Sequence, residues 1–186
     1  MEAEQVDEIP VGSNWQYEPK WDGFRCLIFR RDNDVFLQSK AGQPLGRYFP
    51  EIVSAVQSVT PKWWVMDGEL AVPMGRIFSF DHLLQRVHPA ASRVAKLAKE
   101  TPAIYIAFDL LMAGKKAILC DSRLSERRRQ LDEFSSNFKT TDRFHLSPVA
   151  LETQQVQAWL KETGNNLDGV VCKQRDSGYV SGVSKH

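Results

Sequence analysis

Three short segments of this chain join an Asp-Gly pair to charged residues beside strongly apolar stretches. They are Lys20-Trp21-Asp22-Gly23-Phe24-Arg25, Asp67-Gly68-Glu69 and the segment from Asp168 to Lys173. A lysine amine can act as a nucleophile, carboxylates can hold a hard metal ion, and a guanidinium is a fork of fixed donors. These segments are therefore the first candidates for a catalytic or binding site.

Asp-Gly pairs also have an ordinary structural interpretation, because they are typical of hairpin turns. Each segment taken alone favours that interpretation. Asp67-Gly68, however, lies between apolar β-forming residues, where a turn would break the strand. A glycine inside a strand often marks the close approach of a ligand or another backbone. Lys173 ends an apolar run, from which a long cation can point into a cleft.

The order of these segments resembles the motifs of covalent nucleotidyltransferases, which include ATP-dependent DNA ligases, RNA ligases and mRNA capping enzymes. Lys20-x-Asp22-Gly23-x-Arg25 resembles motif I and Asp67-Gly68-Glu69 resembles motif III. Phe108-Asp109-Leu110-Leu111 resembles motif IIIa, and the segment 168–173 resembles motif IV. From about Tyr17 onward the chain is similar to the adenylation domain of bacterial ligases of the ligase C type, related to the ligase domain of ligase D.

This resemblance implies a relay of AMP that begins on Lys20. The lysine would attack the α-phosphorus of ATP, AMP would pass to a DNA 5′-phosphate, and a 3′-hydroxyl would displace it to seal a nick. A free lysine ammonium has a pKa near 10.4, so attack requires neighbours that favour the neutral amine. A bound Mg²⁺ or Mn²⁺ ion and Lys173 are the expected sources of positive charge.

The same resemblance assigns the nucleotide contacts. Arg25 would hold the ribose or a phosphate, and Lys173 would contact the α-phosphate. Glu18 would receive the adenine amino group, Phe108 would stack on the base, and Val171 would line its opposite face. Stacking on an aromatic ring has a physical basis in its π-system. Burial alone explains Val171 equally well, and an exposed carboxylate is the alternative for Glu18.

Glu69 and Asp168 are the expected metal carboxylates, since Mg²⁺ prefers oxygen ligands and one or two carboxylates suffice beside phosphates. Glu69 could hold the ribose hydroxyls instead. Asp168 stands where many ligases carry Glu, so its contact with the metal could pass through water. Lys40 stands where the family usually carries Arg and would bind the nucleotide without the bidentate fork.

Hydrophobic periodicity and turn residues predict the elements that must position these groups. Strands are expected at 26–30, 35–40, 63–72, 103–114 and 167–174. Helices are expected at 51–59, 78–87, 90–99, 122–134 with Ser122 or Ser125 as N-cap, and 152–164 ended by Gly164. Paired strands without strict βαβ alternation favour an α+β fold. The resemblance implies an ATP-grasp-like arrangement of twisted, mainly antiparallel sheets flanked by helices.

The composition fits a globular domain: of 186 residues, 42% are hydrophobic and 25% charged, with a net charge of +1. That balance neither favours nor excludes a nucleic-acid partner. No apolar run is long enough for a membrane span, and the acidic start lacks the apolar core of a signal peptide. Three widely spaced cysteines indicate neither a zinc site nor a disulfide framework, so a cytoplasmic location is expected.

After motif IV the family usually carries two lysines, but this chain ends at Ser184-Lys185-His186 without that pattern. We therefore expect residues 1–186 to be an adenylation domain that stops before motif V and lacks the OB-fold domain. Nicked double-stranded DNA is the expected partner, with bacterial end-joining or repair proteins as further candidates. Weak sealing by this segment alone is expected.

Two alternatives share these motifs. An RNA ligase or a capping-type nucleotidyltransferase also carries motif I. A non-catalytic nucleotide-binding remnant would keep the fold without the reaction. The stretch from His88 to Arg93, which resembles ligase C, favours the DNA ligase.

Overall fold

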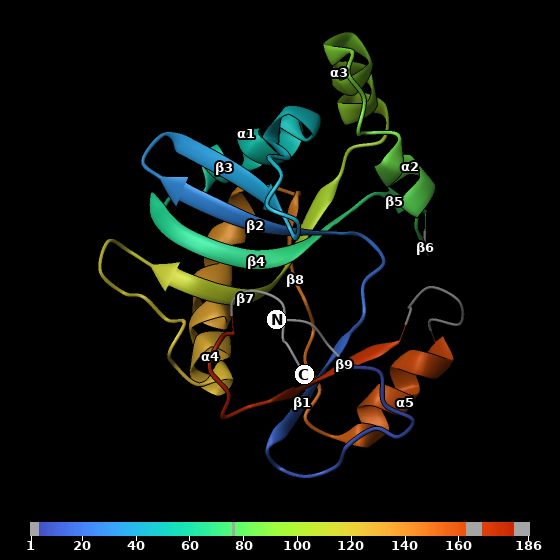
Figure 1. Ribbon diagram of the computed structural model, residues 1–186, viewed down its shortest axis with the longest axis vertical. Coiled ribbons are helices and arrows are strands. Elements are labelled where there is room, and N and C mark those ends of the chain that lie inside the picture. Colours follow the sequence, from blue (N-terminus) through green and yellow to red (C-terminus); the bar gives the residue numbers. More distant parts are fainter. Residues whose placement is uncertain (1–3, 76, 163–168, 181–186) are drawn as a thin grey trace.

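The computed structural model describes residues 4–75, 77–162 and 169–180, apart from the side chain of Glu162. Its largest element is a five-stranded sheet in the order β3-β2-β4-β7-β8 (Figure 1). These strands are β3 (Asp34–Ser39), β2 (Phe24–Arg31), β4 (Trp63–Ala71), β7 (Ile104–Ala113) and β8 (Phe144–Leu146). The β2-β3, β2-β4 and β4-β7 pairs are antiparallel, and β7-β8 is parallel.

Two smaller ribbons complete the strands of the described chain. β1 (Trp15–Pro19) pairs antiparallel with β9 (Val170–Gln174), joining positions that lie about 150 residues apart along the chain. The short strands β5 (Pro73–Met74) and β6 (Ile77–Phe78) form a hairpin after β4. The observed architecture is thus the α+β class with mainly antiparallel sheets that the sequence predicted.

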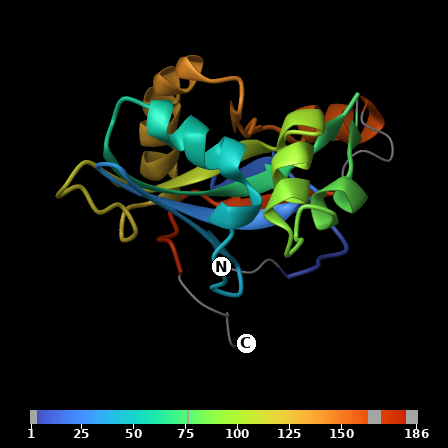
Figure 2. The same cartoon turned by 90° about the horizontal axis from the view of Figure 1, so that it is seen from above.

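Helices cover one side of the large sheet. Figure 2 shows α1, α3 and α4 above the strands, with the described ends of the chain on the other side. The helices are α1 (Pro50–Ser58), α2 (Phe80–Leu84), α3 (Ala91–Glu100), α4 (Leu124–Phe134) and α5 (Thr153–Glu162), with 3₁₀ turns η1 (Gly46–Tyr48) and η2 (Ser135–Thr140). No helix among the described residues has the length and apolar character needed to cross a bilayer.

The main core lies between the large sheet and the helices α1 and α4. Ile52 and Val56 of α1 and Leu131 of α4 join one buried cluster with strand residues that include Trp64 and Met66. All five side chains are fully buried. Because neighbouring strand residues point to opposite faces, the intervening residues of β2, β4 and β7 turn toward the β1-β9 ribbon.

The β1-β9 ribbon has two chemically different faces. Tyr17 packs with Ala150 and with Val156 of α5 in a separate apolar cluster. Gln16 and Glu18 alternate with Tyr17 and are also buried. The ribbon thereby holds polar side chains away from α5, on the side opposite its apolar contacts.

Two predictions about local structure are wrong. The helix expected at 78–87 is confined to α2, because Ile77–Phe78 form β6 and the Phe78 ring packs edge-on against Trp21 at 5.6 Å. The N-cap of α4 is Arg123, without a side-chain cap, and not Ser122 or Ser125. Backbone carbonyls of Ser177 and Arg175 accept from the first amides of α4 instead.

Several predicted elements agree with the structure within a residue or two, namely those at 26–30, 35–40, 51–59, 63–72, 90–99, 103–114 and 122–134. The predicted helix end at Gly164 and the first residues of the strand 167–174 lie outside the described residues. β1 and β8 were not predicted. Each is short and forms a strand only by pairing with another strand that lies far away in the sequence.

Candidate functional site

Glu18, Lys173 and Phe108 meet between the β1-β9 ribbon and the large sheet. Glu18 Oε2 and Lys173 Nζ are 2.8 Å apart, with their side chains 2% and 13% exposed. The Lys173 ammonium also lies 4.6 Å from the centroid of the Phe108 ring. A charge pair of this kind is buried at a cost, so it indicates a binding role more than a stabilising one. The structure thus brings three predicted nucleotide contacts together.

Gln16 completes this group from the same face of β1. Its Nε2 donates to Glu18 Oε1 over 2.9 Å, and Gln16 is 1% exposed. The two oxygens of Glu18 therefore have different partners, which holds the carboxylate in one orientation. Sequence reasoning missed Gln16, although its two-residue spacing from Glu18 on a strand was the available signal.

Arg25 is held on β2 by a buried carboxylate of β4. Its Nε donates to Asp67 Oδ1 over 3.1 Å and its Nη2 donates to Asp67 Oδ2 over 2.6 Å. The Arg25 guanidinium also lies 5.9 Å from the Phe108 ring centroid. Burial alone would lower the pKa of Arg25, but the hydrogen bond and charge of Asp67 raise it. Arg25 therefore stays a cation at the edge of the same group.

Glu69 is the most strongly perturbed carboxyl at this site. Its pKa is raised to about 8, first by burial and then by the neighbouring charges of Asp67 and Asp22. The cations Arg25 and Lys20 act in the opposite direction. Glu69 is also the cross-strand partner of Arg25, so motif I and motif III residues face each other here.

Lys20 follows β1 directly and is exposed. Its backbone amide donates to the Gly169 carbonyl over 2.9 Å, which extends the β1-β9 pairing to the start of motif IV. The charge of Lys20 acts on Glu69, so the two side chains share one electrostatic environment. Lys20 therefore stands two positions after Glu18, at the end of β1 and within electrostatic range of Glu69.

Two glycines allow this close arrangement. A Cβ on Gly23 would lie 2.3 Å from the Leu70 carbonyl oxygen, and one on Gly68 would lie 2.5 Å from that of Ile106. Both glycines therefore permit backbone to approach backbone. A glycine inside a strand indicates the close approach of either a ligand or another backbone, and for Gly68 the close neighbour is the backbone of β7. Gly23 has a packing role of the same kind.

The remaining predicted residues are less central in this structure. Val171 is the cross-strand partner of Glu18. Lys40 is exposed and lies in the turn just after Ser39, the last residue of β3, whose cross-strand partner is Cys26, the neighbour of Arg25. Asp168 lies outside the described residues, and its predicted role as a metal ligand stays a prediction.

A metal site made wholly of protein groups does not occur in the described part of the chain, where no cluster of three or more His, Cys, Asp and Glu is found. Glu69 nevertheless suits a divalent cation, because it is an oxygen donor whose ionisation is disfavoured first by burial and then by two neighbouring carboxylates. A cation beside Glu69 would relieve that repulsion. The residues present therefore fit an ion completed by phosphates and water.

Three successive arginines, Arg127-Arg128-Arg129, lie on α4; charge runs of this kind usually form a solvated face, but Arg127 does not fit that pattern. Arg127 is fully buried, and its Nε and Nη2 donate to Asp109 over 2.8 and 3.0 Å. Arg129 is exposed and pairs with Glu126 and Glu133 along α4. The helical period explains the difference, since successive residues of a helix point in different directions, and Arg128 between them donates to the Ser147 carbonyl.

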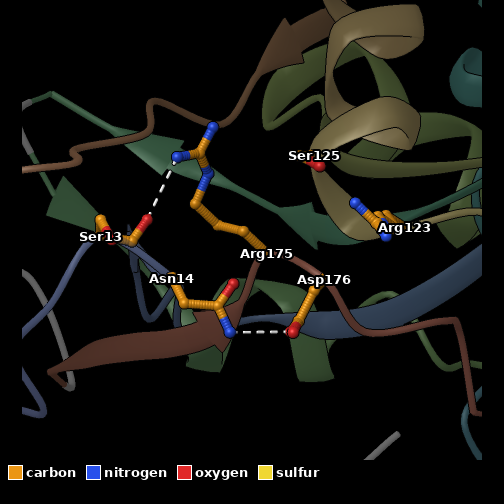
Figure 3. A pocket seen from close by; sticks show the side chains of 6 residues that line it. All are labelled: Ser13, Asn14, Arg123, Ser125, Arg175 and Asp176. Carbon is orange, nitrogen blue, oxygen red and sulfur yellow. Dashed lines mark hydrogen bonds between the residues drawn. The ribbon is translucent and has the colours of Figure 1, made fainter.

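A hollow of about 240 Å³ lies beside the end of β9 and the start of α4 (Figure 3). Arg175 donates to the Ser13 carbonyl there, and Asn14 donates to Asp176. None of the predicted nucleotide contacts lines this hollow. It is thus a separate surface feature.

An aromatic ring, a buried charge pair beside it and a neighbouring lysine at a strand end fit the covalent nucleotidyltransferases that the motifs resemble. Comparison with protein families identifies which family within this class the chain matches. The ATP dependent DNA ligase domain matches residues 2–186, and the chain belongs to this family.

Relatives of known name agree with this assignment. The chain is 43% identical to DNA ligase C2 of Mycolicibacterium smegmatis over 96% of its own length and 49% of that protein. It is 41% identical to DNA ligase C of Mycobacterium tuberculosis over 93% of its length and 48% of that protein. The chain thus spans about half the length of these relatives.

Solved structures show the same fold. The ligase domain of M. tuberculosis LigD superposes with a TM-score of 0.73 and 25% identity, over 89% of this chain and 49% of that one. A mycobacterial DNA ligase D complexed with ATP and MES gives a TM-score of 0.71 and 25% identity, over 89% and 50%. The predicted family, fold class and kinship with ligases C and D are therefore confirmed.

Proposed function

We propose that this chain is the adenylation half of an ATP-dependent DNA ligase, and that Lys20 forms a covalent bond to AMP. The observation that carries the proposal is the contact of Glu18, Lys173 and Phe108 beside Lys20. It joins a flat ring, a fixed acceptor and a fixed donor, which are what a purine base requires. Arg25 and Glu69 extend the group toward the lysine.

In the proposed step, the neutral amine of Lys20 attacks the α-phosphorus of ATP. A nitrogen–phosphorus bond forms, and the bond from that phosphorus to the bridging oxygen breaks. Pyrophosphate leaves with the electron pair, and the lysine nitrogen gives up a proton. A divalent ion bound at Glu69 would supply positive charge to the phosphates. Arg25, held by Asp67, is placed to contact the ribose or a phosphate as a fixed fork of donors.

The charge pair also supports adenine as the base. In the proposed pose, Glu18 accepts from the 6-amino group while the Lys173 ammonium donates to N1. Guanine presents the opposite polarity at these two positions, so the pair would leave its groups unpaired. This disfavours the capping-type alternative, which uses GTP. The contact of Lys173 with the α-phosphate stays a prediction, since its ammonium lies against the Phe108 ring in this structure.

DNA is the proposed acceptor of AMP, because the relatives that match most of this chain are named DNA ligases. Sealing a nick also requires groups that hold the duplex. We therefore propose that residues 1–186 supply the nucleotide chemistry, with Asp168 and Lys40 as further contacts, and that an OB-fold domain supplies a clamp in the whole protein.

The test is the intact mass of the chain after incubation with ATP and Mg²⁺ or Mn²⁺. We expect a gain of one AMP, with release of pyrophosphate. Lys20→Ala should abolish the gain while retaining ATP binding. Lys99→Ala, which removes an exposed lysine on α3, is the matched control and should react like the wild type.

Three outcomes separate the alternatives. Labelling by GTP in preference to ATP would point to a capping-type enzyme. ATP binding without a covalent product would point to a non-catalytic remnant. Preferential sealing of nicked RNA by the chain joined to the remaining half of a relative would point to an RNA ligase.

A further inference from the structure

We infer that Tyr179 is a positioning residue that fixes the Arg25 guanidinium for nucleotide, through a shared contact with Asp67. The inference rests on the proposed function, because Arg25 is taken to bind ATP. Tyr179 follows β9 and is separated from Asp67 by more than a hundred positions in the chain. No motif assigned to the site includes it.

The hydroxyl of Tyr179 donates to Asp67 Oδ2 over 2.8 Å. The same oxygen accepts from Arg25 Nη2 over 2.6 Å, while Oδ1 accepts from Arg25 Nε. Arg25 Nη2 itself approaches the tyrosine oxygen at 3.4 Å. Because Asp67 is fully buried, these three groups form a closed network in which the carboxylate has little freedom to rotate.

The ring of Tyr179 is placed independently of that network. Its backbone amide donates to the Cys120 carbonyl over 2.7 Å. The guanidinium of Arg127 lies 5.8 Å from the centroid of the ring. Arg127 also donates to the Ser177 carbonyl and to buried Asp109, so it ties the segment after β9 to α4 and β7. The segment therefore brings the hydroxyl to Asp67 on a rigid support.

Protonation favours a donor role for this tyrosine. Burial raises the pKa of Tyr179, and the charge of Asp67 raises it further. The phenol thus stays neutral over the physiological range and donates its proton to the carboxylate. Arg25 has many rotamers when free, and a network that holds one of them reduces the entropy lost when ATP binds.

The experiment compares Tyr179→Phe with wild type in the rate of AMP transfer to Lys20 at varied ATP concentration. Loss of one hydrogen bond to a charged group should raise the KM for ATP about tenfold, with a smaller change in kcat. Tyr17→Phe is the matched control, because Tyr17 is buried in the apolar cluster with Ala150 and Val156 and its hydroxyl donates to the Pro10 carbonyl, away from Asp67. It should leave the KM unchanged.

Adding Tyr179→Phe to an Arg25→Lys variant tests whether Tyr179 acts through Arg25. Lysine lacks the fork that Asp67 grips, so Tyr179→Phe should have little further effect on KM in that variant. The dissociation constant of ATP, measured in a Lys20→Ala background where no AMP is transferred, should rise with Tyr179→Phe and should rise little further when Arg25→Lys is also present. Circular dichroism at the assay temperature verifies that every variant is folded.

The outcomes are distinct. If Tyr179→Phe matches wild type in KM and affinity, or if its effect persists in full beside Arg25→Lys, the inference is overturned. Wild type would then still form its AMP adduct, and the proposed function would stand. If wild type neither binds ATP nor reacts, the proposed function fails and the inference fails with it.

Discussion

The two faces of the large sheet differ in what they bury. Toward α1 and α4 the buried side chains are mostly apolar and join one cluster. Toward the β1-β9 ribbon lie Glu18 with Lys173 and Arg25 with Asp67, which are charge pairs with little exposure. Apolar burial favours folding directly, whereas a buried ion pair often contributes no net stability. The helix-covered face therefore holds the fold together, and the ribbon-covered face is organised for binding.

The largest effect on stability is expected on the helix-covered face. Trp64 is fully buried, and Trp64→Ala should lower the free energy of unfolding by about 3–5 kcal/mol. Its neighbour Trp63 is the matched control, because it points the other way and is partly exposed. Urea denaturation of both variants measures the difference. If both variants lost the same free energy of unfolding, the helix-covered face would not contribute more to stability than the other face.

A smaller and more informative effect is expected for the charge pair. Lys173→Met leaves Glu18 buried without its cation and should cost about 3 kcal/mol of stability. Replacing both residues, as Glu18→Leu with Lys173→Met, should recover most of that loss. ATP affinity should be lost in both variants. Recovered affinity in the double variant would show that the pair does not bind the nucleotide.

The smallest effect is expected at Glu69, and it should have the opposite sign. The folded pKa of about 8 lies above the ordinary value of 4.5, so folding favours the protonated form. Stability from this group is present below pH 4.5 and is lost as the pH rises to about 8. One pKa unit corresponds to 1.36 kcal/mol, and relaxation of a partly exposed carboxyl reduces the total to about 2 kcal/mol.

Glu69→Gln should therefore stabilise the nucleotide-free chain at pH 8 and have little effect at pH 4.5. Thermal unfolding of both proteins at the two pH values measures this. Val65→Ala, on the same strand and face, is a control whose effect should not depend on pH. A stabilisation that is equal at both pH values would contradict a raised pKa for Glu69.

Local structure was largely predictable from the residues themselves. The runs that became β2, β4 and β7 are rich in β-forming residues, and α1 and α3 have helical spacing or propensity. The motif residues at Lys20, Arg25, Glu69, Phe108 and Lys173 were also visible, because their spacing is short and fixed. Such features depend on neighbours along the chain, which is why a sequence reveals them.

The wrong predictions of local structure concern residues whose conformation depends on partners far away in the chain. Ser122 and Ser125 are good N-caps by residue type, yet carbonyls from Arg175 and Ser177 satisfy the first amides of α4. Phe78 begins the helix predicted at 78–87, yet it belongs to β6 and packs on Trp21. In each case a partner far away in the chain outcompetes the local preference, and local propensities are weak enough for that to happen.

The sequence by itself determined the family, the α+β class and the identity of most candidate site residues, since these follow from motif spacing and hydrophobic period. Tertiary structure alone decided which charges meet: Lys173 with Glu18, Arg127 with Asp109, and Tyr179 with Asp67. The reason is that a buried charge needs a partner at hydrogen-bond distance. Which residue supplies that partner depends on strand register and on how the β1-β9 ribbon packs against the large sheet, not on position in the chain.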